Sequence, residues 1–404
     1  MPGTRLRRWI LLCWMLVLAT GLSAQPPVAR PSGIRNADWQ NFSPDPDHPE
    51  HMPVRQLRVN FHVMNSRDSS HNFRPEAGRD YCRRLLDNAN RQLDTNIRNW
   101  RSPQGTEVLP KNYRYVLWPQ PGDDGIYFHF DDSLYYLVYS GKNQNNYDRT
   151  VIRKYGVGTD SILNIFIQVH PDDSIKSPTY KANLQGIALG NAVKIAGVYE
   201  QGKNAFGHEA LLNHEIGHSL GLIHAWGEDN CPDTDKHPNK CWEWTEQPPC
   251  RDLASNNMMD YNAYQIALTP CQIGRIHRGL SDEKNALRRC LIPTWCTRQE
   301  GKDVVIRDSV SWNGARDLEG NLIVAAGGAL RLSARVSLPE GAYIQVEKGG
   351  RLWLDGATLH NACQLPWQGL VWGKKRRRGE VFEIKPATWN NCPLPKNISA
   401  VKKG

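Results

Sequence analysis

The stretch HEIGHSLGLIH, residues 214 to 224, decides the fold of this chain, because it spaces three histidines around one glutamate and two glycines. Residues four apart lie on the same face of an α-helix, so His214 and His218 can present their imidazole nitrogens to a single ion. Gly221 follows and can adopt the left-handed conformation that ends a helix, after which the chain can turn and bring back His224. Three neutral histidines with an open fourth position are typical of a catalytic zinc site.

The glutamate in this stretch adds a candidate general base. Glu215 is next to the first histidine, where its carboxylate could reach a water molecule on the ion. HExxH alone is a weak signal, but the added glycine and third histidine lower the expected number of chance matches to on the order of 10⁻⁵. A cluster of ordinary surface or core histidines is the competing interpretation, and the full spacing disfavours it.

The residues before this stretch predict strands and helices in alternation. Leu57, Val59, Phe61 and Val63 alternate with polar residues, which is typical of a half-buried strand. Apolar residues then recur at three- and four-residue spacing from Cys82 to Ile97, which predicts an amphipathic helix. Further strands are expected at 113–118, 126–130, 135–139 and 162–169, the last in a central position because it is apolar on both faces.

Two more helices are expected around the histidines. Residues 209–222, EALLNHEIGHSLGL, have helical spacing in which the leucines and Ile216 face a core while His214 and His218 face away from it. Thr269 is a good N-cap and Pro270 suits the first helical position, so a helix is expected to start there. Residues 53–295 therefore read as one mixed α and β domain.

The composition changes after Cys296. VAAGGALRLSA (324–334) and VEKGGRLWLDG (346–356) align at a spacing of 22 residues. Short strands with a period near 20 predict the stacked turns of a β-solenoid, but with only two clear copies a β-sandwich remains the alternative. The repeat resembles the parallel β-helix repeats that are appended to secreted bacterial proteins. We expect residues 296–404 to form a small all-β accessory domain.

The N-terminus predicts export. Three arginines precede an apolar run at 9–22, and Leu22-Ser23-Ala24 offers a cleavage site before Gln25, so residues 1–24 read as a signal peptide. Residues 25–52 are rich in Pro, Asp and His and are expected to form an extended lead-in. No later segment is long and apolar enough to span a bilayer, so we expect a secreted bacterial protein, extracellular or periplasmic.

Cysteine usage agrees with export. Nine cysteines follow the signal peptide, and six of them lie between 231 and 296, which indicates disulfides in a loop-rich region. Their connectivity stays open, and the odd total leaves at least one thiol unpaired or in an intermolecular bridge. The basic run KKRRR (374–378) is expected to be a solvated loop rather than a nucleic-acid site.

The motifs carry a family resemblance. HEIGHSLGLIH matches HExxHxxGxxH, the signature of the metzincin metalloproteases. Downstream, ASNNMMDYN (254–262) resembles their Met-turn, and together with CPDT (231–234) it looks like the pappalysin-type branch, over roughly residues 53–290. The resemblance implies an α+β fold with a twisted mixed sheet, an active-site helix and a Met-turn subdomain.

The resemblance also implies a role for each matched position. The histidines of the signature bind zinc, the glutamate is the general base, and the methionine of the Met-turn forms the floor of the site. In this sequence these are His214, His218 and His224 for the metal, Glu215 for the base and Met259 for the floor. Some metzincins also use the tyrosine two residues after the methionine, here Tyr261, to bind the metal or stabilise the oxyanion.

Further expectations concern ligands around the site. The family implies a peptide substrate that pairs as an extended strand with an edge strand above the metal, for which GIALGNAVKIAGV (186–198) is the candidate. Calcium sites occur in the branch, and Asp229 or Asp233 could contribute to one. Other residues are expected to be structural rather than functional: Cys82, His62, His170, the pair His208–Glu209, and Trp367 and Trp372, whose alternative is carbohydrate stacking.

Taken together, these residues predict a secreted zinc-dependent endopeptidase that hydrolyses peptide bonds through a zinc-activated water, with Glu215 as general base. One alternative is a surface-binding or adhesion protein, in which the C-terminal β domain acts and the protease is an inactive or latent scaffold. The intact Glu215 favours the enzyme, because a decayed enzyme would be free to lose it. A zinc hydrolase of non-peptide amides shares the same site and is a third alternative.

Overall fold

The structure is a computed structural model that describes residues 38–139, 141, 143–171, 175–176, 182–202, 204–372, 379–396 and 398–400. The expected signal peptide (1–24) and the basic run (374–378) lie outside the described residues. Among the described residues, no helix has the length and apolar character needed to cross a membrane.

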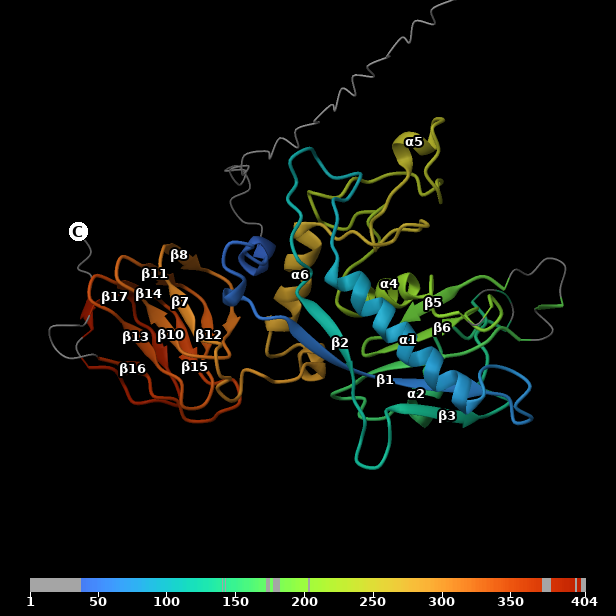
Figure 1. The fold of residues 1–404 in the computed structure, drawn as a ribbon, viewed down its shortest axis with the longest axis horizontal. Helices are drawn as coiled ribbons and strands as arrows, with labels where there is room; N and C mark the ends of the chain where they lie inside the picture. The colour runs from blue at the N-terminus through green and yellow to red at the C-terminus, as the bar shows by residue number, and fades with distance from the viewer. Residues whose placement is uncertain are drawn as a thin grey trace, which may run out of the picture. The chain divides into compact units, whose positions relative to one another are not determined.

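A six-stranded mixed sheet organises the first part of the chain (Figure 1). Its central strand β1 (Arg55–Asn65) is eleven residues long, so it pairs along one edge with two shorter strands in succession. The order is β2-β1-β4-β6-β5, with β3 also on β1. The bounds of the other strands are β2 (Tyr113–Leu117), β3 (Ile126–Phe130), β4 (Leu163–Ile167), β5 (Gln185–Ala188) and β6 (Ala192–Ala196).

All pairings in this sheet are parallel except that of β5, which runs antiparallel to β6 at the edge. The strands expected at 113–118, 126–130 and 162–169 are confirmed within a residue or two. The strand expected at 135–139 is wrong, because that segment makes only an isolated bridge between Tyr136 and Val169. Tyr135 there packs against the apolar cluster that contains Met64 and Phe166.

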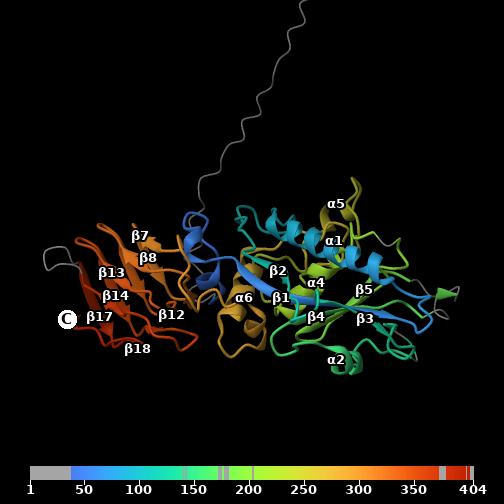
Figure 2. The same cartoon turned by 60° about the horizontal axis from the view of Figure 1, so that its bottom comes forward.

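Both faces of the sheet are covered (Figure 2). Leu57, Val59, Phe61 and Val63 of β1 enter the main core together with α1 (Pro75–Asp94) and α4 (Glu209–Ser219). On the other face, Met64 packs with Val151 and Ile152 of α2 (Thr150–Tyr155). The prediction of a half-buried strand was therefore wrong on one point: the polar-facing side of β1 is buried too, under α2.

Helix α1 ends earlier than its apolar spacing predicts. It stops at Asp94, and Ile97, which continues the pattern, is 38% exposed. Thr95 is extended, and the buried ammonium of Lys111 donates to the carbonyl oxygen of Gln92 in the last helical turn at 3.0 Å. The Lys111 side chain donates to a carbonyl group near the C-terminal end of the helix, and a positive charge there complements the helix dipole. This tertiary contact therefore coincides with the end of the helix.

The remaining helices position the loops. Helix α6 (Pro270–Ser281) begins as predicted, since Thr269 accepts from the N–H of Gln272 and the Gln272 side chain accepts from the N–H of Thr269. Shorter helices are η1 (Asp38–Phe42), η2 (Pro49–His51), α5 (Cys250–Leu253) and η3 (Ala286–Cys290). The described part of the lead-in is thus not simply extended: it forms η1 and η2, and Phe42, His51 and Met52 are buried.

The chain after Cys296 forms three sheets in which every pairing is parallel. Successive short strands visit the three sheets in turn, and Val324 pairs with Val346 while Leu330 pairs with Leu352, as the 22-residue spacing predicts. This pairing favours stacked turns over a sandwich. The first sheet holds β7 (Val304–Ile306), β10 (Leu322–Val324), β13 (Ile344–Val346) and β16 (Leu370–Val371).

The second and third sheets complete this region. The second holds β8 (Ser309–Trp312), β11 (Ala329–Leu332), β14 (Arg351–Asp355), β17 (Glu380–Lys385) and β19 (Ser399–Ala400). The third holds β9 (Arg316–Asp317), β12 (Arg335–Ser337), β15 (Thr358–His360) and β18 (Thr388–Trp389). They enclose their own apolar core, and Trp367 is buried in it against Trp389, which fits its expected packing role.

Three disulfides join cysteines of the described chain: Cys231–Cys271, Cys241–Cys250 and Cys296–Cys363. Two of them lie within the cysteine-rich region and the third ties its end to the β-rich region. Cys82, Cys290 and Cys392 are free thiols. Cys82 is fully buried in the main core, as expected for a structural cysteine. The boundary expected at residue 296 stays a prediction.

Candidate metal centre

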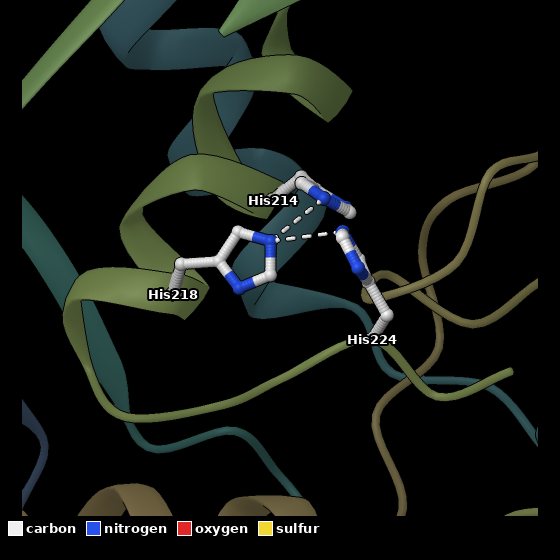
Figure 3. Close-up of side chains that lie close together, drawn as sticks. All are labelled: His214, His218 and His224. Atoms are coloured by element: carbon white, nitrogen blue, oxygen red, sulfur yellow. Dashed lines mark hydrogen bonds between the residues drawn. The ribbon is translucent and has the colours of Figure 1, made fainter. Parts of the chain in front are cut away.

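Three imidazole nitrogens meet at one point beside α4 (Figure 3). His214 and His218 lie one turn apart on the helix, and the turn after Ser219 brings back His224. The Nε2 atom of His218 lies 3.1 Å from that of His214 and 3.2 Å from that of His224. Gly221 has φ +91°, the left-handed value expected at this helix end.

The hydrogen bonds on the far side of the rings decide what these nitrogens can do. The Nδ1 of His214 donates to the carbonyl oxygen of Met258 at 2.8 Å, and that of His218 donates to Leu222 at 2.9 Å. A neutral imidazole whose Nδ1 carries the proton has a bare lone pair at Nε2. The Nε2 atoms of His214 and His218 are therefore acceptors that face each other, which is unfavourable without a cation between them.

The distances fit such a cation. Two nitrogens that lie 2.0–2.1 Å from a tetrahedral zinc ion are about 3.3 Å apart, close to the separations found here. Burial lowers the pKa of His214 to about 3 and that of His224 to about 4, so both rings are neutral at pH 7, as a metal requires. The residues present therefore fit zinc, and three protein nitrogens leave a fourth tetrahedral position for water or a substrate atom.

A tight turn under the helix holds the triad in place. Met259 is fully buried with its sulfur beneath Gly217 of α4. Its carbonyl oxygen accepts from the N–H of Ala225 at 2.9 Å, next to His224, while the preceding carbonyl accepts from His214. Two consecutive carbonyls thus hold His214 and the residue that follows His224, which lie on different segments. The predicted role of Met259 as the floor of the site stays a prediction.

The carboxylate of Glu215 lies between α4 and the edge strand β5. The residue is 6% exposed, and a Cβ atom placed on Gly186 would come within 2.6 Å of the Cγ of Glu215 and 2.7 Å of its Oε1. Burial raises the pKa of Glu215 to about 8, while the backbone N–H of Ala188 donates to the carboxylate and opposes that shift. A cation in the triad would lower the pKa again.

The edge strand is shorter than the segment predicted for it. The candidate segment 186–198 contains two strands, and only β5 forms the edge, because β6 lies inside the sheet between β4 and β5. Gly186 therefore belongs to the edge strand itself. The sequence did not single it out, since the need for a glycine comes from a carboxylate that is distant in sequence.

Tyr261 lies beside the histidine triad, and Tyr139 is in its neighbourhood. The ring of Tyr261 lies 4.8 Å from that of His224 and 5.8 Å from that of His214, between centroids, and the residue is 43% exposed. Burial, with smaller contributions from Tyr139 and Glu215, raises the pKa of Tyr261 to about 12, so its hydroxyl keeps its proton at pH 7. Tyr139 lies close enough to interact electrostatically with both Tyr261 and Glu215, and no pattern in the sequence pointed to it.

The calcium candidates have local partners. Asp233 accepts from the hydroxyl of Thr269 at 2.7 Å and from the N–H of Cys271 at 2.8 Å, so it caps α6. Asp229 accepts from the N–H of Cys231 and the hydroxyl of Thr234 with one oxygen. The expected role of either residue in binding calcium stays a prediction.

Several other histidines have the structural partners expected of them. His62 bonds His129 and Asn164 in the covered face of the sheet. His170 bonds the carbonyl of Asn183, and His208 bonds the hydroxyl of Tyr81 at 2.8 Å. These contacts favour packing roles, as expected for all three.

Comparisons with known proteins give a distant likeness. No family model matches the chain, and no curated protein does. A structure of mature mirolysin from Tannerella forsythia in complex with a cleaved peptide is 20% identical, with a TM-score of 0.41, over 59% of this chain and 95% of that chain. Mirolysin in complex with a compound is 19% identical, with a TM-score of 0.41, over 60% and 97%.

A third structure, a mutant of Tannerella forsythia promirolysin, is 18% identical, with a TM-score of 0.40, over 63% of this chain and 89% of that chain. At these identities and TM-scores, the chemistry of the site has to be drawn from the chain's own residues.

Proposed function

We propose that this chain is a secreted zinc-dependent endopeptidase of the metzincin type, related to the pappalysin branch. The observation that carries the proposal is the triad: the Nε2 atom of His218 lies 3.1 Å from that of His214 and 3.2 Å from that of His224, and the Nδ1 protons of His214 and His218 are held by backbone carbonyls. His214, His218 and His224 are the proposed ligands. Two facing lone pairs with a third imidazole nitrogen beside them are best satisfied by a cation.

A bound zinc ion would supply a Lewis acid that polarises the scissile carbonyl and acidifies water. Glu215 takes the proton of the attacking water and passes it to the leaving amine. Its carboxylate is held beside β5, where the N–H of Ala188 donates to it and the missing side chain of Gly186 leaves it room. Tyr261 donates its hydroxyl hydrogen to the developing oxyanion, which is worth about 2.7–4 kcal/mol if it acts like other oxyanion donors.

The substrate binds as an extended polypeptide along β5. An edge strand offers unpaired main-chain N–H and C=O groups to an incoming strand, and β5 is the edge nearest the proposed base. A main-chain contact of this kind favours peptides over small amides. We propose no nucleic-acid partner for this chain, and we assign no partner to its C-terminal region.

The proposal also covers the C-terminal region and the N-terminus of the chain. Residues 296–404 are proposed to form a β-solenoid accessory domain, supported by the parallel pairing of successive turns. Export through the signal peptide at 1–24 to a bacterial extracellular or periplasmic location agrees with the three disulfides. An adhesion protein on an inactive scaffold is the competing function, and the buried, backbone-held Glu215 disfavours it.

The test is proteolysis of unfolded casein by the purified mature chain, with zinc content measured on each protein. We expect wild type to cleave with about one catalytic zinc, Glu215→Ala to keep that zinc and lose cleavage, and His218→Ala to lose both. Glu246→Gln, on an exposed side chain, is the matched control and should behave as wild type. Cleavage by Glu215→Ala at the wild-type rate would refute the assigned base.

A further inference from the structure

A second cluster of metal-binding side chains lies far from the triad in sequence. His48, Glu50 and His51 gather at η2, and their ligand atoms lie within 4.8 Å of one another. Asp308, in the turn between β7 and β8, approaches the same cluster. The four residues therefore come from two segments separated by more than 250 positions, and local sequence alone does not account for their meeting.

His51 carries the main indication of a ligand. Its side chain is 95% buried, and its Nε2 atom has no hydrogen-bond partner among the described residues. The nearest acidic atom is Oε1 of Glu50, at 3.5 Å. Buried polar groups in proteins are nearly always paired, so an unpaired imidazole nitrogen aimed at a carboxylate calls for a third group that both can bind.

The distances suit a shared ion. A nitrogen and an oxygen on one tetrahedral zinc are about 3.3 Å apart, and here Oε1 of Glu50 lies 3.5 Å from His51 Nε2 and 3.8 Å from His48 Nδ1. The two imidazole rings are stacked, with centroids 4.7 Å apart and planes 11° apart. The His48 ring must therefore turn to aim Nδ1 at the ion, which its partly exposed position allows.

Asp308 completes the arrangement from the other side of His48. Its Oδ2 lies 3.7 Å from His48 Nε2, the nitrogen that does not face Glu50. Histidines that bind metals commonly donate their second ring N–H to a carboxylate, which fixes the orientation of the ring. Asp308 can supply that contact when His48 turns. His51 is held from behind, since its ring meets Trp312 of β8 edge-to-face at 5.4 Å.

We propose that His48 Nδ1, Glu50 Oε1 and His51 Nε2 bind a second, structural zinc ion, with Asp308 positioning His48. The two imidazoles and one carboxylate match the ligands that zinc takes in proteins, and water completes the coordination. The ion fastens η2 of the lead-in against the turn that carries Asp308. This site does not rest on the proposed peptidase activity.

The test counts zinc in a full-length background that lacks the first site. His214→Ala/His218→Ala is dialysed against micromolar zinc, desalted and measured by inductively coupled plasma mass spectrometry. We expect about one zinc per chain in this background and less than a tenth of that after His48→Ala or His51→Gln is added. Asp47→Asn, an exposed neighbouring carboxylate, is the matched control and should keep the zinc.

A second readout separates binding from misfolding. Added zinc should raise the thermal midpoint of the background protein, and His48→Ala should abolish that rise while leaving the midpoint without zinc unchanged. Because His48 is partly exposed, this variant still tests the site if His51→Gln fails to fold. A background protein that holds no zinc, or zinc that persists in His48→Ala, would overturn the proposal and leave the triad untouched.

Discussion

A Cβ atom on Gly217 would overlap the sulfur of Met259 and lie 3.2 Å from its methyl carbon. Gly217 is in the middle of α4, between the two helical histidines, and the missing side chain lets the Met259 turn press against the helix. The same turn holds His214 and Ala225 through its carbonyls. The helix α4, the Met259 turn and the segment that carries His224 therefore pack together as one unit.

Gly217→Ala should weaken this unit. The methyl group forces Met259 away from the helix, and overpacking of this kind costs about 1–3 kcal/mol of unfolding free energy. Urea unfolding of the wild type and the variant measures that loss, and a chelator competition measures zinc affinity, which should fall as well. Gly227→Ala, where a Cβ would only touch the His224 carbonyl at 3.7 Å, is the control. Equal losses in both variants would contradict the explanation.

Gly186→Ala should impair the proposed base without removing the metal. Its methyl group would come within 2.6–2.7 Å of the Glu215 side chain, so the carboxylate must swing away from Ala188. We expect kcat on a peptide substrate to fall at least tenfold, a barrier increase of about 1.4 kcal/mol or more, with zinc content unchanged. If kcat stays at the wild-type value, the close approach of Gly186 to Glu215 does not limit the reaction.

The meeting of the three histidines can be predicted from the sequence because helical geometry relates them locally. His214 and His218 are one turn apart, and Gly221 allows the sharp return to His224. By contrast, the carbonyls of Met258 and Met259, the gap at Gly186 and the approach of Tyr139 are tertiary contacts. Nothing in the local spacing of a single sequence specifies which distant backbone group a side chain will meet.

The errors in the predicted fold have the same origin. The apolar periodicity predicts that the first helix continues beyond Asp94, where it ends in the structure. There the buried Lys111, from another segment, donates to a carbonyl oxygen of the last helical turn. A strand is predicted at 135–139, but a ladder needs a partner strand and that segment has only one bridge. The repeat after Cys296 is predicted well, because a 22-residue period repeats the same local pairing.

Asp317→Asn should destabilise the protein strongly. Asp317 is fully buried and accepts from Arg288 at 2.7 and 3.0 Å and from Arg335 at 2.6 Å, with Arg55 at 3.5 Å. Burial alone would raise the pKa of this carboxyl, but the arginines, Arg335 foremost, hold it well below its usual range.

Removing this one negative charge takes the shared counter-ion from three buried or partly buried guanidinium groups, of which Arg335 keeps a second partner in Glu283. Breaking a buried ion pair in this way typically costs about 3–5 kcal/mol, which urea unfolding at pH 7 would detect as a lower midpoint. Asp160→Asn, at an exposed position, provides the comparison and should shift the midpoint little. A loss below 1 kcal/mol for Asp317→Asn would mean that water or rearranged side chains replace the carboxylate.

His277 should make stability depend on pH in the mildly acidic range. The ring is 1% exposed in α6, and its Nε2 donates to the carbonyl oxygen of Lys111 at 2.9 Å. Burial lowers the pKa of His277 to about 4, against 6.5 in the unfolded chain. Between these values the unfolded state binds the extra proton, so the stabilisation is complete above pH 6.5 and is lost as the pH falls towards 4.

At pH 5 the unfolding free energy should be about 2 kcal/mol lower than at pH 7 on account of His277 alone, because each pKa unit corresponds to about 1.4 kcal/mol. His277→Gln keeps a donor near the same place and cannot be protonated, so it should remove that part of the pH dependence. Other buried histidines, such as His62, contribute equally to both proteins and cancel in the difference. The measurement is urea unfolding of both proteins at pH 7 and pH 5, and identical losses would show that His277 is protonated in the native state or accessible to water.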